Sequence, residues 1–154
     1  MLRILLTLVF LVSQITPAAA DSYDDLLAAI KLNDLSTVET LFARGMDPNT
    51  TDPGANTLLM LAIRENHLDM VRRLLDRQAR VSARNSYGET ALMLAAAKGN
   101  LEMVQLLADR GAAINQAGWN PLIYAAWQGH TEVVRYLLEK GAKIDALSPN
   151  GISA

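Results

Sequence analysis

The sequence predicts an all-α solenoid of helix-turn-helix units with short turn fingers, containing four repeats and the start of a fifth. Residues 85–107 match residues 52–74 at a constant offset of 33, a period typical of solenoids. The same pattern occurs one unit earlier in residues 26–38, and one unit later in residues 118–138. Within the units, apolar residues recur at helical spacing, as in Leu101, Val104 and Leu107.

The first helix of each unit is bounded by residues that favour helix ends. Its start is predicted at side chains that can accept hydrogen bonds from free backbone N–H groups, namely Asp24, Thr57, Thr90 and Asn120. Pro121 then occupies a first helical position, where its missing N–H has no cost. The helix is expected to end at residues that tolerate a left-handed backbone, namely Asn33, Asn66, Gly99 and Gly129.

The second helix of each unit carries one apolar stripe, which predicts that one face is buried. The stripe consists of Leu35/Val38/Leu41, Leu68/Val71/Leu74, Leu101/Val104/Leu107 and Val134/Leu137. The helix is expected to end at Gly45, Gln78, Gly111 and Gly141. Gln78 is the exception, because a positive φ there costs a non-glycine residue about 1 kcal/mol.

The first twenty residues have the features of a secretory signal peptide. Arg3 precedes the apolar run 4–12, and Ala18-Ala19-Ala20 supplies small residues for cleavage before Asp21. The run is shorter than the roughly 20 residues of a membrane-spanning helix, although an uncleaved anchor is the alternative. The chain contains no cysteine, which suits a bacterial periplasmic protein better than a small disulfide-stabilised secreted domain. We therefore expect a periplasmic or secreted protein.

The repeat pattern divides the chain into consecutive units. These are a cleaved signal peptide (1–20), repeat 1 (21–51), repeat 2 (52–84), repeat 3 (85–116), repeat 4 (117–146) and the truncated start of repeat 5 (147–154). A stack without a polar terminal repeat leaves an apolar end exposed, so we expect either that the chain is a truncation or that two copies pair end to end.

The repeats resemble the ankyrin repeat family over residues 22–154. The resemblance depends on the segments Gly88-Glu-Thr-Ala-Leu-Met-Leu-Ala-Ala96, Gly129-His-Thr-Glu-Val-Val134 and Leu138-Glu-Lys-Gly-Ala142. The chain departs from the family's Thr-Pro-Leu-His turn, which reads Thr57-Leu-Leu-Met60, Thr90-Ala-Leu-Met93 and Asn120-Pro-Leu-Ile123. In the family that histidine resembles a hydrogen-bonding strut between repeats, so its loss puts the rigidity of the fingers in question.

The composition gives little support to catalysis, metal binding or nucleic-acid binding. After signal cleavage the chain has 13 basic and 16 acidic residues, and therefore a net charge of −3. Positive and negative charges alternate along the sequence and do not form a basic stripe. His67 and His130 stand two repeats apart, too far to share a metal, and we expect each to cap a second helix. The pairs Met60/Met93 and Met70/Met103 suggest copper ligands or, more plainly, core fillers. We expect no enzyme activity and no cofactor.

The resemblance implies that partner proteins bind the concave side, along the fingers and the exposed face of the first helices. The candidate contact residues in this register are Trp119, Trp127, Gln128, Tyr87, Glu89, Lys98, Arg64, Glu65 and Asn56. Trp, Tyr and Arg are enriched in protein-binding hot spots. The core positions of that helix are already filled by Leu122, Ile123, Ala125 and Ala126, so Trp127 is expected on the surface. Trp119 either contacts the partner or packs over a finger that is three residues short.

The function predicted from these observations is a non-catalytic, exported scaffold that binds a partner protein on its concave face. A resemblance to exported bacterial ankyrin repeat proteins implies support for a periplasmic stress enzyme such as catalase. The alternative is a secreted effector or toxin-neutralising inhibitor that blocks an enzyme's active site. Neither function requires nucleic acid, a small-molecule ligand or a membrane after signal cleavage.

Overall fold

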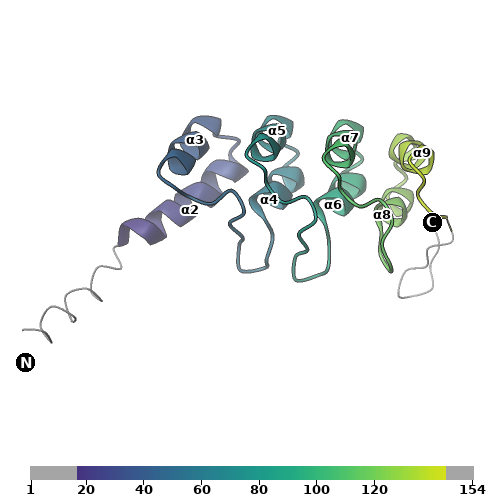
Figure 1. Ribbon diagram of the computed structural model, residues 1–154, viewed down its shortest axis with the longest axis horizontal. Coiled ribbons are helices and arrows are strands. Elements are labelled where there is room, and N and C mark those ends of the chain that lie inside the picture. The colour runs from purple at the N-terminus through teal and green to yellow at the C-terminus, as the bar shows by residue number, and fades with distance from the viewer. Residues whose placement is uncertain (1–16, 145–154) are drawn as a thin grey trace, which may run out of the picture.

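The helices form two layers along a single row of repeats. The computed structural model describes the backbone of residues 17–144 and the side chains of residues 22–144. Eight helices within this part pair successively, with the loops between pairs extending away as fingers (Figure 1). The first layer consists of α2 (Pro17–Lys31), α4 (Leu58–Arg64), α6 (Ala91–Lys98) and α8 (Pro121–Trp127). The second layer consists of α3 (Leu35–Ala43), α5 (Leu68–Asp76), α7 (Leu101–Asp109) and α9 (Thr131–Glu139). The predicted solenoid is confirmed.

The core lies between the two layers and between successive repeats. In α4 and α6 the first six residues of each helix are buried, because each helix has a neighbouring repeat on both sides. Met60, Met93, Met70 and Met103 are at most 1 % exposed within this apolar core. Flexible methionine side chains fill irregular gaps in such cores, so the interpretation of these residues as core fillers is confirmed.

The predicted helix starts are confirmed for repeats 2 to 4 and wrong for repeat 1. Thr57, Thr90 and Asn120 accept hydrogen bonds from backbone N–H groups in the first turns of α4, α6 and α8. Asp24, by contrast, lies inside α2, which begins at Pro17. Proline suits the first helical position, and Ala18 to Ala20 have the strongest helix propensity. Helix α2 therefore crosses the predicted cleavage point, while residues 1–16 lie outside the described residues.

The helix ends have the predicted left-handed backbone. Asn33 and Asn66 have φ of 57° and 60°, and Gly99 and Gly129 have φ of 70° and 74°. Gln78, the predicted exception at the end of a second helix, has φ of 61°. These residues turn the chain sharply enough for the second helix to pack back against the first.

The two histidines do not cap the second helices as predicted. His67 and His130 occupy the N-cap positions of α5 and α9, but neither side chain accepts a cap hydrogen bond. Each imidazole Nε2–H instead donates to a carbonyl one repeat earlier, that of Lys31 and that of Ala97, both at 2.8 Å. The equivalent Asn100 also bonds to the preceding repeat, because its amide donates to the Asn66 side chain at 2.8 Å. The histidines thus link repeat 1 to 2 and repeat 3 to 4.

The last described repeat leaves apolar side chains exposed. Ala126 was expected in the core but is exposed, because among the described residues no further helix pair covers α8 and α9. Leu138 and Ile144, which border the same surface, are 38 % and 56 % exposed. The expected start of repeat 5, at 147–154, lies outside the described residues, so the expected truncation or end-to-end pairing stays a prediction.

Among the residues that the structure describes, no helix has the length and apolar character needed to cross a membrane.

Candidate functional site

Three aromatic rings gather where the last finger meets α8. The ring centroids of Trp119 and Tyr124 are 5.5 Å apart with an interplanar angle of 59°. Those of Trp119 and Trp127 are 5.8 Å apart at 52°. Both separations fall within the range of favourable aromatic pairs. Trp127 is 65 % exposed, whereas Trp119 and Tyr124 are half-buried. We call these three residues the aromatic cluster.

The aromatic cluster and Gln128 line an open hollow of about 170 Å³. Pockets for drug-sized ligands usually have volumes of about 300 to 1,000 Å³. This hollow therefore suits a side chain or two from a larger molecule better than a nucleotide-sized ligand.

The shortened finger explains why Trp119 can reach the helix. Trp119 takes the place that Asn56 and Glu89 hold in the preceding repeats, directly before the helix N-cap. Gly118 turns the chain just before it with φ of 81°. Trp119 contacts the rings of Tyr124 and Trp127 and also borders the hollow. Its assignment as a partner contact stays a prediction.

Tyr124 is the member of the aromatic cluster that the sequence analysis missed. It occupies a helix position that holds Leu61 in α4 and Leu94 in α6, both buried. A tyrosine that replaces leucine in one repeat of several combines apolar area with a hydroxyl that needs a partner. That substitution was visible in the sequence and could have identified the residue.

Glu89 lies beside Tyr124 and connects it to the neighbouring repeats. Its carboxylate accepts hydrogen bonds from the Tyr124 hydroxyl at 3.1 Å and from the Asn85 amide at 2.8 Å. Arg64 forms an ion pair with the same carboxylate at 3.1 Å. Burial, followed by the negative charge of Glu89 and the hydrogen bond to it, raises the pKa of Tyr124 to about 12. The tyrosine hydroxyl is therefore held protonated as a donor.

The hydrogen bonds continue from Glu89 into the preceding finger. The Asn85 amide also donates to the Asn56 side-chain oxygen at 2.9 Å, and the Asn56 amide donates to Asp52 at 3.0 Å. Burial raises the pKa of Asp52, but hydrogen bonds from Asn56 and Gly54 and the charge of Arg64 outweigh burial, so the net pKa is lowered. These contacts, together with the Arg64 ion pair and the Tyr124 hydrogen bond, are called the finger network.

The finger network corrects one predicted contact residue. Asn56 was expected on the binding surface, but it is 7 % exposed and its amide holds two fingers together. The Glu89 side chain is 18 % exposed, and its oxygens already have partners. A buried amide must keep its hydrogen bonds, because an unsatisfied one costs about 1 to 3 kcal/mol. The network therefore joins the fingers of repeats 2 and 3.

The other predicted contact residues are exposed, and among the described residues none of them contacts the aromatic cluster. Tyr87, at a finger tip, is 81 % exposed. Lys98 and Glu65 lie at the ends of α6 and α4, where both are exposed. Within residues 22–144, no hydrogen bond, ion pair or ring contact joins these three side chains to the aromatic cluster. The structure therefore brings together Trp119, Trp127 and Gln128 from the predicted set, and pairs Arg64 with Glu89.

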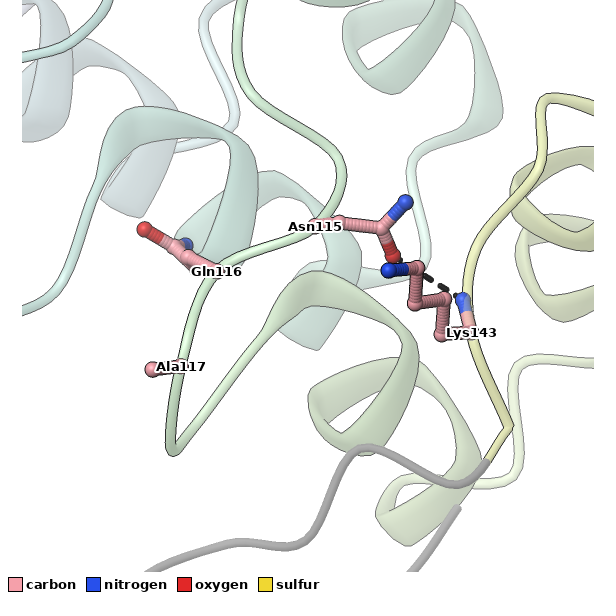
Figure 2. Close-up of a pocket in the computed structure, with 4 residues that line it drawn as sticks. All are labelled: Asn115, Gln116, Ala117 and Lys143. Carbon is pink, nitrogen blue, oxygen red and sulfur yellow. Dashed lines mark hydrogen bonds between the residues drawn. The ribbon is translucent and has the colours of Figure 1, made fainter.

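A second, polar hollow of about 320 Å³ lies between the last finger and the segment that follows α9. Figure 2 shows Asn115 directed toward Lys143, with Gln116 and Ala117 farther along the finger. The Asn115 side chain accepts from the Lys143 N–H and donates to the Gly141 carbonyl, both at 2.9 Å. Because the Asn115 side chain already forms hydrogen bonds to both backbone groups, we interpret this hollow as a packing junction between successive loops.

The comparisons with known proteins agree with this architecture. The family model described as "Ankyrin repeats (3 copies)" matches residues 26–117 and again residues 78–148. The search of curated proteins found no match. The two matched segments overlap and together cover residues 26–148, which include the last finger and the aromatic cluster. This chain therefore belongs to the ankyrin repeat family.

Proposed function

We propose that this protein is a non-catalytic scaffold that binds a partner protein on its concave face. Ankyrin repeats are modules of protein-protein interaction, which supports the general class. The concave face is the one formed by the fingers and by the exposed ends of α4, α6 and α8. The single observation that carries the proposal is Trp127, which is 65 % exposed although α8 has a filled core.

The surroundings of Trp127 favour specific binding over nonspecific hydrophobic association. Binding hot spots are enriched in tryptophan and tyrosine, and they gain affinity when the side chains are held in place before the partner arrives. Trp119 touches both other rings of the aromatic cluster, and the Tyr124 hydroxyl is fixed by Glu89. A partner side chain would therefore meet an ordered surface.

Site-specific photo-crosslinking in a native extract tests the proposed face. A photoreactive phenylalanine analogue replaces Trp127 in one variant and Gln105, an exposed residue of α7 in the other layer, in the matched control. We expect a discrete crosslinked partner at position 127 and none at position 105. Crosslinking at position 105 alone would place the binding surface on the second layer and overturn the proposal.

We also propose that the protein is exported and that residues 1–20 are removed. The support is the charged start, the apolar run 4–12 and the small residues before Asp21. N-terminal sequencing of protein from its native host tests this, with Asp21 as the expected first residue. A cytoplasmic protein that still begins at Met1 would contradict export.

The finer proposal is that the partner is a periplasmic stress enzyme such as catalase. It rests on the resemblance to exported bacterial ankyrin repeat proteins and on the proposed export. Pull-down from a periplasmic extract, compared with a host-cell lysate, tests it. A partner found only in the host-cell lysate would favour the secreted effector or inhibitor instead.

A further inference from the structure

We infer that the aromatic cluster binds a short proline-rich segment of the partner in the polyproline II conformation, with an acidic residue about three positions from the prolines. The inference rests on the proposed function and names the kind of segment that the concave face recognises. Three properties of the hollow carry it: the arrangement of its rings, its free hydrogen-bond donors and the charge of its surroundings.

The rings are arranged to receive flat, compact side chains. Trp119 is tilted by 59° against Tyr124 and by 52° against Trp127, so neither pair forms a flat stack, and the three residues line an open hollow. Polyproline II helices dock their pyrrolidine rings into aromatic-lined grooves of this kind, and the segment is already extended before it binds. The hollow of about 170 Å³ suits side chains of that size.

The rim of the hollow offers hydrogen-bond donors. The indole N–H groups of Trp119 and Trp127 and the side-chain amide of Gln128 form no hydrogen bond within residues 22–144. A proline-rich segment offers carbonyl acceptors and few N–H donors, because proline has no backbone N–H. Donors on the protein and acceptors on the segment are therefore complementary.

The charges nearby favour a neutral ring in the hollow over a cation. Glu89 is the acidic group beside the aromatic cluster, and its charge is already paired with Arg64. The cation of the adjacent repeat, Lys98, occupies the position equivalent to Gln128 and forms no ion pair within residues 22–144.

The position of Lys98 also sets the spacing to an acidic residue. Packed helices lie about 8 to 10 Å apart. Polyproline II rises about 3.1 Å per residue, so an acidic residue about three positions from the prolines would reach Lys98.

Intrinsic fluorescence provides a direct test, because both tryptophans of the chain belong to the aromatic cluster. The full chain is titrated with a synthetic peptide that contains Pro-Pro-Ala-Pro and an aspartate about three residues away, on either side in two versions. We expect a saturable fluorescence change with at least one version. Replacing the prolines by alanine, or Trp127→Ala in the protein, should weaken binding about tenfold or more.

A charge reversal separates the acidic contact from the ring contact. Lys98→Glu should weaken binding of the aspartate peptide several-fold, and the same peptide with lysine in place of aspartate should bind Lys98→Glu better than the unchanged protein. Lys31→Glu serves as the matched control, because it makes the same charge reversal at the exposed end of a first-layer helix, α2, but three repeats from the aromatic cluster. It should change binding less than Lys98→Glu does.

Any one of three binding results would overturn the inference. They are equal binding of the alanine peptide, no saturable binding of any peptide, and tighter binding of tetramethylammonium, which would identify a cation site. A partner crosslinked at position 127 through a segment without proline would also overturn the inference while supporting the proposed function. Failure of both the peptides and the crosslinking would reject both proposals.

Discussion

At the residue scale, Gln78 holds a backbone position that three other repeats give to glycine. Its φ is 61°, and the equivalent Gly45, Gly111 and Gly141 have φ between 86° and 94°. Gln78→Gly should stabilise the fold by about 0.5 to 1 kcal/mol, because relief of the left-handed conformation exceeds the added entropy of an unfolded glycine. Urea unfolding measures the difference.

Two further variants, one at position 78 and one at the equivalent position 111, separate backbone strain from side-chain effects. Gln78→Ala keeps the strain and should give no gain. Gly111→Ala creates the strain where an added Cβ has no neighbour within 4 Å, and it should therefore destabilise. If Gln78→Ala stabilised as much as Gln78→Gly, the explanation from backbone strain would be wrong.

The ionisation of Tyr124 makes the free energy of unfolding depend on pH in the alkaline range. Its pKa is raised from the usual 10 to about 12. Between these two pH values, the folded state therefore keeps a proton that the unfolded state has lost. The stabilisation is complete below about pH 10 and is lost as pH rises through 12. Tyr124→Phe lacks the hydrogen bond to Glu89 and should be less stable at neutral pH.

The pH dependence of that difference provides the measurement. Tyr124→Phe cannot ionise, so its stability deficit should shrink between about pH 10 and 12 when urea unfolding is compared with the unchanged protein. A deficit that stays constant would show that Tyr124 ionises equally easily in both states, and a deficit that grows would show that its pKa is lower in the folded state; either result would contradict the account.

At the element scale, the His130 imidazole that links repeat 3 to repeat 4 lies against Gly99. A Cβ added at Gly99 would come within 2.3 Å of the imidazole, and Gly99 has φ of 70°. Gly99→Ala should therefore cost clearly more than Gly129→Ala, whose added Cβ meets nothing within 4 Å at a similar φ of 74°. Chemical unfolding of both variants gives the two costs.

A double-mutant cycle identifies the source of the extra cost. In a His130→Ala background the imidazole is absent, so Gly99→Ala should cost about as much as Gly129→Ala, on the order of 1 kcal/mol. An unchanged cost of Gly99→Ala in that background would mean that the histidine does not occupy the space beside the glycine.

The elements that the sequence predicted correctly are those whose signals are local. The caps at Thr57, Thr90 and Asn120 and the left-handed helix ends follow from the chemistry of single side chains. Asp24 was misassigned because the alanines before it extend the helix, and the role of His130 was missed because its partner is one repeat away.

The candidate site was predictable only in part for the same reason. The register placed Trp127 on the surface, where the structure also has it. The burial of Asn56 and the place of Tyr124 in the aromatic cluster depend on hydrogen bonds to side chains of adjacent repeats. Ala55, with φ of 58°, gave no signal either, because alanine is not a residue that normally marks a left-handed turn.

At the scale of the whole molecule, each repeat is stabilised mainly by its neighbours. Stability in such a stack is approximately the sum of repeat and interface terms, so the end repeats have the least support. The aromatic cluster lies in the last repeat of the described solenoid, on α8 and the finger before it, and α8 packs against α6. Ion pairs between second-layer helices, such as Arg110 to Asp76 at 3.1 Å, are exposed and add little.

The central claim is that Trp127 serves binding rather than folding, and the unfolding free energy of Trp127→Ala tests it most directly. Because the side chain is 65 % exposed, we predict a change within about 0.5 kcal/mol. Leu107→Ala, at a fully buried position, is the comparison and should cost about 2 to 5 kcal/mol. A loss for Trp127→Ala that approaches the loss for Leu107→Ala would contradict the account.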